Sequence, residues 1–342
     1  MKKYNVAVVG VGAVGEEMLR VLRQRQFPVD QLKVFARRAR TIEVDGQRYN
    51  VEELNENSFK GMHIALFAGT EGDKGAAVTY APAAVKAGCV VIDNGADFRM
   101  RPDVPLVVPE ANAQALKKHK GIIANPNCST IQMVVALAPI KKKVGLKRVI
   151  VSTYQAVSGS GRGGVVQVEA EYKAWAQGSG ENIARHMDQK IAFNVFPHIG
   201  SFNDDGYTTE EMKLVHETHK ILNDKKIKIS STTVRVPVRI GHSEAVYIET
   251  AKPISAEAVK NLLKKSPGIV LVDDPKSKLY PMPVDCEGKD EVFVGRIRKD
   301  PFVKTGLWLW VVADNLRKGA ASNAVQIAEE LVKNGWLMSR TK

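Results

Sequence analysis

The sequence has no apolar run of about 18–20 residues, the length that a helix needs to cross a membrane, so we expect no membrane span. Its N-terminus passes from two lysines directly into a short strand-like run, which indicates no secretory signal. Cysteine is scarce, since the 342 residues contain only Cys89, Cys128 and Cys286, and three cysteines make no disulfide framework. These absences argue against a membrane protein or a disulfide-stabilised secreted protein and predict a cytoplasmic location.

The composition is that of an ordinary folded protein, because 44% of the residues are hydrophobic and 25% are charged. At 342 residues the chain is too long for one compact core, which predicts two domains. The formal net charge of +13 comes from lysines and arginines spread along the chain, without a concentrated basic motif. We therefore expect this charge to attract small anionic substrates or phosphorylated cofactors, and we expect no nucleic-acid partner.

Short apolar runs alternate with helical patterns in the first part of the chain. The spacing of apolar residues predicts helices over residues 16–25 and 76–87. Between and around these helices lie runs that we expect to be buried strands: Asn5–Val9, Leu32–Phe35, Ile64–Phe67, Val90–Asp93, Leu106–Val108 and Ile122–Ala124. This alternation is typical of an α/β domain with a Rossmann-type, doubly wound parallel sheet.

The second part of the chain has longer β-branched segments, which predict strands at 149–156, 227–238, 245–250, 292–297 and 307–313. Helical spacing predicts helices over 169–176, 209–222 and 255–264. Between Ile229 and Val238, polar and apolar residues alternate as they do in an antiparallel sheet with one covered face.

A last helical pattern at 320–333 is suited to pack back on the first domain. We therefore predict two domains. The first comprises residues 1–127 and is completed by 315–342, and the second is an inserted α+β domain over 128–314.

A glycine-rich turn follows the first expected strand. Gly10-Val-Gly12-Ala13-Val14-Gly15 is a GxGxxG pattern directly before a helix. Glycine at the first position permits a tight turn, at the second it lets the backbone approach a pyrophosphate, and at the third it permits close packing of helix on strand. The N–H groups at the helix N-terminus favour phosphate as well. Because strand, turn and helix follow in this order, we predict that the turn binds a dinucleotide.

Two arginines follow the second expected strand, at Arg37 and Arg38. An enzyme that prefers NAD places an acidic residue here, on the ribose hydroxyls, whereas a guanidinium can hydrogen-bond the 2′-phosphate of NADP. The competing interpretation is a solvated basic loop. We predict a preference for NADP over NAD.

Cys128 is the candidate nucleophile. It lies in Asn125-Pro-Asn-Cys-Ser-Thr130, directly before a helical pattern. The N–H groups and dipole of a helix N-terminus stabilise a thiolate and so lower the pKa of the thiol. A free cysteine is more often a small buried hydrophobic residue, and Cys89 fits that description. The polar segment before Cys128 favours the reactive interpretation there.

The segment Asn-Pro-Asn-Cys-Ser-Thr resembles the active-site segment of aspartate-semialdehyde dehydrogenases. The resemblance covers essentially the whole chain and includes, in order, the segments 93–100 (DNGADFRM), 108–112 (VPEAN), 154–159 (YQAVSG), 235–242 (RVPVRIGH), 294–298 (VGRIR) and 314–321 (DNLRKGAA). Together these segments are highly specific, and the chain is similar to this family throughout.

The resemblance implies an NADP-dependent reaction that interconverts aspartate 4-semialdehyde plus phosphate with aspartyl 4-phosphate, a step towards lysine, threonine, methionine and diaminopimelate. The thiolate of Cys128 would attack the aldehyde, and loss of hydride would leave a thioester that phosphate attacks. The resemblance also implies that the first domain binds NADP and the second carries catalysis and dimerisation. A homodimer or homotetramer is expected, again by resemblance alone.

Two further catalytic roles follow from the resemblance. His242 matches the family's base, which suits an imidazole, and Gln155 would orient the thioester oxygen. His216 and His219 are one residue short of the spacing of a zinc HExxH motif, so we expect no metal.

The substrate contacts are also assigned by resemblance. Arg235 matches the arginine that pairs with the α-carboxylate, Glu210 the carboxylate that contacts the ammonium, and Lys213 a lysine that binds phosphate. An ordinary surface pair at i,i+3 spacing is the competing explanation for Glu210 and Lys213. Arg99 matches a second phosphate contact, and Asn127 is placed to assist it.

Contacts to the cofactor on the nicotinamide side are assigned in the same way. Ser158 and Gly159 resemble the residues that make this contact, although their glycine-rich loop would also suit a flexible turn. Asn315 resembles the contact made from the C-terminal segment.

Two alternatives remain open. One is an enzyme like N-acetyl-glutamyl-phosphate reductase, which shares the chemistry but acts on an acylated amine with no ammonium for Glu210 to pair with. The other is a non-catalytic NADP-binding paralogue, against which the joint presence of Cys128, Gln155 and His242 argues.

Overall fold

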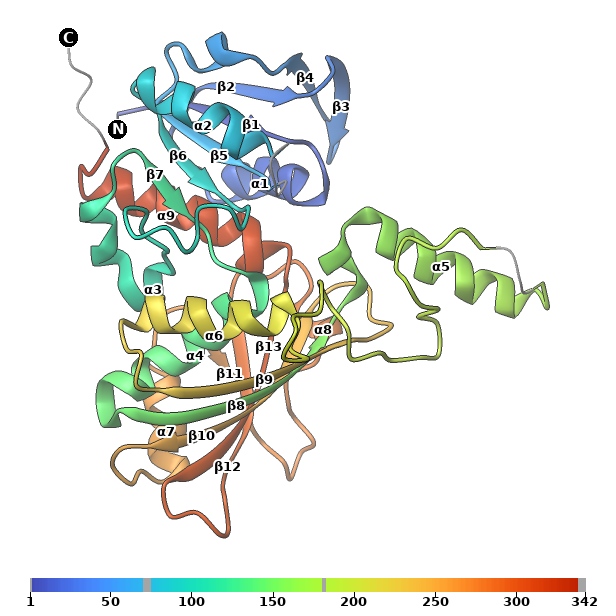
Figure 1. Ribbon diagram of the computed structural model, residues 1–342, viewed down its shortest axis with the longest axis vertical. Coiled ribbons are helices and arrows are strands. Elements are labelled where there is room, and N and C mark those ends of the chain that lie inside the picture. Colours follow the sequence, from blue (N-terminus) through green and yellow to red (C-terminus); the bar gives the residue numbers. More distant parts are fainter. Residues whose placement is uncertain (1, 70–74, 180–182, 338–342) are drawn as a thin grey trace. The chain divides into compact units, whose positions relative to one another are not determined.

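The computed structural model describes residues 2–69, 75–179 and 183–337 (Figure 1). The chain divides into two compact units. The first unit contains Met1–Asn127 and Ala320–Lys342, and the second contains Cys128–Gly319. Residues 315–319, which the sequence assigned to the first domain, therefore lie in the second unit. Within the described residues, no helix combines the length and the apolar character that crossing a membrane requires.

The described part of the first unit contains a seven-stranded sheet in the order β3-β4-β2-β1-β5-β6-β7. Neighbouring strands are parallel except at β3–β4, so the expected doubly wound sheet is confirmed. The strands are β1 (Tyr4–Val9), β2 (Val29–Ala36), β3 (Arg40–Val44), β4 (Gln47–Glu53), β5 (Ile64–Phe67), β6 (Val90–Asp93) and β7 (Ile122–Ala124).

Helices cover this sheet and complete its core. They are α1 (Ala13–Gln24), α2 (Ala76–Lys86), the short α3 (Pro109–Asn112) and α9 (Ser322–Lys333), with 3-10 turns η1 (Glu56–Phe59) and η2 (Ala113–Lys118). From α9, Val325 and Ile327 are fully buried in one cluster with Val6 and Val8 of β1. The expected return of the C-terminal helix to the first domain is thus confirmed.

In the first unit, one predicted strand is absent from the described residues and one hairpin was not predicted. Leu106–Val108 is not a strand, because Leu106 makes only an isolated bridge to Ala124. The hairpin of β3 and β4 was not predicted, since most of its side chains are polar and exposed and so leave no apolar run. Its signal was the pair Asp45-Gly46, both with positive φ (49° and 76°), as a two-residue hairpin turn requires.

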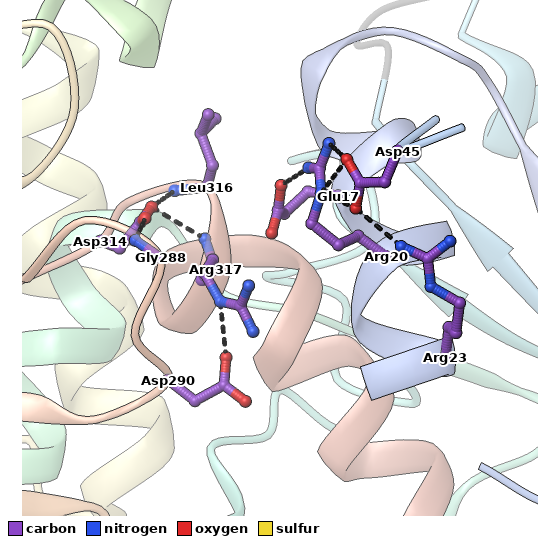
Figure 2. A network of polar contacts seen from close by, with 9 residues as sticks. All are labelled: Glu17, Arg20, Arg23, Asp45, Gly288, Asp290, Asp314, Leu316 and Arg317. Atoms are coloured by element: carbon purple, nitrogen blue, oxygen red, sulfur yellow. Dashed lines mark hydrogen bonds and ion pairs between the residues drawn. The ribbon is translucent and has the colours of Figure 1, made fainter. Parts of the chain in front are cut away.

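The Asp45 carboxylate also ties this hairpin to α1 (Figure 2). Arg20 Nε donates to it at 2.9 Å and Arg23 Nη2 at 2.7 Å, while Glu17 pairs with Arg20 from the same helix. Such half-exposed ion pairs contribute little singly, but together they fix the turn on the helix. The hairpin in turn limits where the loop of residues 37–39 can lie.

The second unit contains a six-stranded sheet in the order β11-β12-β13-β10-β8-β9, counted over the residues that the structure describes. The strands are β8 (Leu146–Gln155), β9 (Lys228–Arg235), β10 (His242–Thr250), β11 (Ile269–Leu271), β12 (Val292–Lys299) and β13 (Gly306–Ala313). β9 pairs in parallel with β8, so the antiparallel expectation for this segment was wrong. Alternation reports that one face is covered, and it says nothing about the direction of the neighbouring strand.

Helices of the second unit are α4 (Cys128–Val144), α5 (Arg162–Ala176), α6 (Thr209–Leu222), α7 (Ala256–Leu263) and α8 (Pro283–Cys286), with η3 (Val157–Ser160) and a π-helical turn η4 (Arg317–Ala321). α4 packs on β8, β10, β12 and β13, and α6 packs on β9 and α4 (Figure 1). Strand residues on this helix-covered face, such as Val149, Val151, Val246 and Leu309, are at most 1% exposed.

Candidate active site

The glycine turn lies at the carboxyl end of β1, which pairs with β2 on one side and β5 on the other. This is the topological switch point of a doubly wound sheet, where ligands bind. Gly10 has φ +97°, and a Cβ at Gly15 would lie 1.9 Å from the Gly10 carbonyl oxygen, so both positions need glycine. A Cβ at Gly12 would meet no atom within 4 Å among the described residues. Gly12 therefore borders open space at the start of α1, and the turn fits a pyrophosphate.

Arg37 and Arg38 follow the end of β2 and are exposed. The amide of Gly10 donates to the carbonyl oxygen of Phe35 at 2.8 Å, so the glycine turn and the end of β2 are directly joined. The two arginines thus come from the strand next to the turn, where the ribose of a dinucleotide lies in this fold.

Cys128 is the first residue of α4 and is half-buried. The expected place of the thiol at a helix N-terminus is what the structure shows. In the π-helical turn, Gly319 approaches it closely, because a Cβ at Gly319 would lie 2.9 Å from Cys128 Cβ. The sequence analysis missed Gly319, whose only signal was its place in the DNLRKGAA segment.

The segment before Cys128 is held by buried polar contacts in the first unit. Arg99, 5% exposed, donates from Nε to the carbonyl oxygen of Asn125 at 3.0 Å and from Nη2 to that of Asn94 at 2.7 Å. The side chain of Asn125 donates to Asn94 Oδ1 at 2.8 Å and accepts from Asn323 at 2.6 Å. Arg99 therefore orders the backbone of the segment that leads to Cys128. Asn127 is also buried.

His242 is the first residue of β10 and is fully buried. The backbone N–H of Ala156, just after β8, donates to its Nδ1 at 3.0 Å. Because Nδ1 accepts, the neutral ring carries its proton on Nε2. Nε2 is buried and has no hydrogen-bond partner among the described residues. Burial, and next to it the positive charge of Arg235, hold the pKa of His242 well below its usual value of 6.5.

Arg235 ends β9 beside Gln155, which ends β8. Its Nη1 donates to the carbonyl oxygen of Ala156 at 2.6 Å, and only 5% of the residue is exposed. Burial lowers the pKa of Arg235, an effect opposed by the charges of Glu210 and Cys128. A Cβ at Gly159 would lie 2.9 Å from Arg235 Nη1 and 3.2 Å from His242 Nε2, so glycine is needed for this close approach.

Glu210 and Lys213 lie in the first turn of α6. The helix begins with a capping box, in which the Glu211 amide donates to Thr208 Oγ1 and the Thr208 amide donates to Glu211 Oε2. Glu210 is 6% exposed, accepts from Gln155 Nε2 at 3.3 Å and lies 3.5 Å from Lys213 Nζ. The burial of Glu210 separates this pair from an ordinary surface ion pair.

Ser158 and Asn315 contact each other in the second unit, with Asn315 Nδ2 2.9 Å from Ser158 Oγ. Asn315 Oδ1 accepts from the amide of Gly241, next to His242. The preceding residue, Asp314, accepts from the amides of Gly288, Leu316 and Arg317, and Arg317 Nε donates to Asp290 at 2.9 Å (Figure 2). These bonds hold the segment that carries Asn315.

The structure thus gathers part of the predicted site within the second unit: Gln155, Gly159, Glu210, Lys213, Arg235 and His242. The charge of a Cys128 thiolate raises the pKa of Arg235. Ser158 and Asn315 belong to the same unit. The remaining predicted residues belong to the first unit: Gly10, Gly12, Ala13, Val14, Gly15, Arg37, Arg38, Arg99 and Asn127. The backbone of Ala156, which no side-chain pattern marks, was missed by the sequence analysis.

Two family models match the chain. The model described as semialdehyde dehydrogenase, NAD binding domain matches residues 5–119, and the model described as semialdehyde dehydrogenase, dimerisation domain matches residues 137–318. Among solved structures, one described as aspartate semialdehyde dehydrogenase II complexed with ASA, from Vibrio cholerae, superposes with a TM-score of 0.92 at 47% identity and covers 98% of this chain and 99% of that chain.

Curated relatives agree with these matches. The aspartate-semialdehyde dehydrogenase of Aquifex aeolicus is 54% identical, over 97% of this chain and 99% of the relative. That of Bacillus subtilis is 50% identical, over 96% of this chain and 97% of the relative. With its two-unit fold, its half-buried cysteine at a helix N-terminus and these full-length similarities, the chain belongs to the aspartate-semialdehyde dehydrogenase family, whose members are oxidoreductases that act on an aldehyde.

Proposed function

We propose that the protein is an NADP-dependent aspartate-semialdehyde dehydrogenase that interconverts L-aspartate 4-semialdehyde, phosphate and NADP with L-aspartyl 4-phosphate and NADPH through a thioester on Cys128. The observation that carries this proposal is the buried cluster of Arg235, Glu210 and His242 around Gln155 and Gly159. It offers one cation and one anion to an amino acid, and a thiolate at Cys128 raises the pKa of Arg235 by its charge.

The charges of the cluster match the substrate. Arg235 presents a guanidinium that can hold an α-carboxylate by two parallel hydrogen bonds, and Glu210 presents a carboxylate to the ammonium. Both side chains are nearly buried, so their charges act with little screening by water. Lys213, Arg99 and Asn127 are proposed to bind the phosphate.

The chemistry starts with the thiolate of Cys128, which forms a carbon–sulfur bond with the aldehyde carbon and leaves the negative charge on its oxygen. As the carbonyl re-forms, hydride leaves and a neutral thioester remains on Cys128. Bound NADP supplies the hydride acceptor. Phosphate then attacks the thioester carbon, the carbon–sulfur bond breaks, and acyl phosphate, thiolate and one proton are released. Gln155 is proposed to orient the thioester oxygen.

The hydrogen bond to His242 supports a role as a donor. A base, which the family resemblance implies, needs a lone pair on the nitrogen that meets the substrate, but the Ala156 amide leaves the proton of the neutral ring on Nε2. An attacking thiolate requires no base in the oxidative half. We therefore propose that His242 donates from Nε2 to the substrate oxygen while that oxygen carries negative charge.

We propose contacts to two parts of NADP, the adenine-side phosphates and the nicotinamide side. The open space at Gly12 and the start of α1 suit the pyrophosphate, and Arg37 and Arg38 suit the 2′-phosphate. Ser158, Gly159 and Asn315 are proposed to contact the nicotinamide side.

A homodimer is proposed from the dimerisation-domain match and from the second sheet. The face of this sheet away from α4 carries Ile150 and Tyr154, 41% and 39% exposed, and the rings of Tyr154 and Trp310 lie 5.5 Å apart. An apolar hollow lined by Tyr280, Met282 and Trp310 adjoins it. Sedimentation velocity distinguishes this dimer from a homotetramer, the other oligomer that the family resemblance implies.

The activity is tested by offering aspartate semialdehyde and N-acetyl-glutamate semialdehyde, each with NADP and phosphate. Turnover of aspartate semialdehyde alone is expected, because only that substrate has an ammonium for Glu210. Turnover of the acetylated aldehyde alone would overturn the substrate assignment. If neither aldehyde is turned over, the proposed dehydrogenase activity is refuted.

The nucleophile is tested by alkylation with iodoacetamide, followed by mass spectrometry and activity. We expect modification of Cys128, loss of turnover, and protection by bound aspartate semialdehyde. The chain supplies its own controls, because Cys89 and Cys286 are buried and burial raises the pKa of Cys286 to about 12. Full activity after complete alkylation of Cys128 would refute the thioester.

A further inference from the structure

A fully buried carboxylic acid lies next to the catalytic cluster and has no part in the chemistry above. Glu244 is the third residue of β10, two residues after His242, so both side chains point to the helix-covered face. Burial raises the pKa of Glu244 well above its usual value of 4.5, and its contact with Gln132 lowers the pKa only in part. Burial therefore favours the protonated form of Glu244 over the carboxylate.

Glu244 belongs to a polar row that crosses the sheet below the catalytic residues. In the strand register it lies opposite Thr153 of β8, which lies opposite Thr233 of β9, and all three are fully buried. This row is two residues further from the strand ends than Arg235, Gln155 and His242. The two rows are connected, because Gln155 Nε2 donates to Thr153 Oγ1 at 3.3 Å.

Gln132 joins this layer from the helix of the nucleophile. It lies four residues after Cys128 in α4, one turn along the same face, and is fully buried against β10. Its Nε2 donates to the backbone carbonyl oxygen of His242 at 3.3 Å. Its Oε1 has no hydrogen-bond partner of ordinary geometry among the described residues, and neither have the two carboxyl oxygens of Glu244. The two neighbouring side chains are thus both buried with polar atoms that no other described residue pairs.

We propose that Gln132 and Glu244 form a positioning pair that holds His242 at a set distance from Cys128. Gln132 spans from α4 to the backbone of His242, and its side-chain contact with Glu244 fixes the orientation of the amide. Neither side chain touches the substrate. This inference rests on the proposed function, since the distance matters only if His242 meets the oxygen of a substrate bound to Cys128.

The first test replaces Gln132 by methionine, which has a similar volume and makes no comparable hydrogen bonds. Gln132→Met is expected to lower kcat on aspartate semialdehyde by about 10–100-fold, because a displacement of the order of an ångström costs that much in a catalytic site. The KM values for the aldehyde and for NADP should stay within about twofold of wild type, since the lost interaction binds neither. A merely structural role would lower the unfolding temperature without this separation of kcat from KM.

Two variants at Glu244 provide the comparison. Glu244→Gln keeps a polar side chain that can hydrogen-bond Gln132, so its kcat should remain within about threefold of wild type, whereas the kcat of Glu244→Met should fall as that of Gln132→Met does. Thr218→Val is the matched control, because Thr218 of α6 is also fully buried and its Oγ1 has no partner among the residues described. Its kinetics should not change.

A kcat within threefold of wild type in Gln132→Met would overturn the proposal, as would KM values that rise in step with the loss of kcat. If Gln132→Met does not fold, the ratio of kcat between Glu244→Gln and Glu244→Met decides, and a ratio near one overturns the pair. A wild-type protein without activity refutes the proposed function and not this pair. In that case the ¹⁵N resonances of the His242 ring and the alkylation rate of Cys128 decide: a change in Gln132→Met supports the pair, and unchanged values overturn it.

Discussion

The backbone amide of Ala156 donates to Nδ1 of His242 at 3.0 Å, and this bond decides which nitrogen of the ring carries the proton. A backbone N–H can only donate, so Nδ1 must be the acceptor and Nε2 the protonated atom of the neutral ring. The low pKa that burial and Arg235 impose on His242 keeps the ring neutral at pH 7. The neutral ring therefore presents an N–H at Nε2, which is the basis of the donor role proposed for His242.

The donor role predicts a difference between two substitutions at this position. His242→Ala removes the donor and should lower kcat by about 10²–10³-fold, the usual cost of losing one hydrogen bond to a developing oxyanion. His242→Gln keeps an N–H near the place of Nε2 and should retain at least about tenfold more activity than the alanine variant. Steady-state kinetics at saturating substrate measure both. Equal losses would favour a base, since glutamine cannot accept the proton.

Arg235→Lys should not be neutral, although the charge is kept. One ammonium cannot reproduce the two-pronged contact with a carboxylate, nor the bond from Nη1 to the Ala156 carbonyl. We expect kcat/KM for aspartate semialdehyde to fall about 10–100-fold, the value of one charge-assisted hydrogen bond. Arg239→Lys is the control, because Arg239 is exposed and pairs with the exposed Glu169. Similar kinetics for the two variants would contradict the assignment.

Arg37→Ala combined with Arg38→Ala should weaken NADP selectively. The KM for NADP is expected to rise about 10–100-fold while that for NAD stays within about twofold, since only NADP has the 2′-phosphate. Arg48→Ala, in the exposed part of the β3–β4 hairpin, removes one positive charge nearby and serves as the control. Equal weakening of both cofactors would show that the arginines act through general charge.

The burial of Glu244 should make the free energy of unfolding depend on pH. Its pKa is raised in the folded protein, so above pH 4.5 the unfolded chain loses a proton that the folded chain keeps. This contribution to the free energy of unfolding is complete below pH 4.5 and is lost as pH rises towards the folded pKa, by up to about 1.4 kcal/mol for each pH unit.

Glu244→Gln removes this term, so urea unfolding should show a more favourable change in stability from pH 5 to pH 7 in the variant than in wild type. Both pH values lie above 4.5, and the titration of His242 is common to the two proteins and cancels in the comparison. The same change in both proteins would mean that Glu244 is ionised in the folded protein.

Local patterns sufficed for the features that depend on neighbouring residues. The turn at Gly10–Gly15 follows from strand, glycine spacing and helix, and the capping box of Thr208 and Glu211 from their spacing of three. The place of Cys128 at a helix start also follows from its own segment. The spatial grouping of Arg235, Glu210 and His242 followed only from the family resemblance, since 25–32 residues separate Glu210 from the other two.

The direction in which strands pair and the partners that they choose did not follow from local patterns. Alternation in β9 predicted a covered face, but the parallel pairing with β8 depends on the whole second sheet. The hairpin of β3 and β4 is held by Asp45 on Arg20 and Arg23, contacts between residues more than 20 positions apart.

By itself the sequence determined the α/β architecture, the glycine turn after the first strand and the place of Cys128 at a helix start, because each depends on residue types and spacings along the chain. The tertiary structure alone decided the tautomer of His242, the burial of Glu244 and the position of Gln132 between them. Those properties arise from a backbone amide, a lack of solvent and a helix packed on a sheet, and distant parts of the chain supply all three only once it has folded.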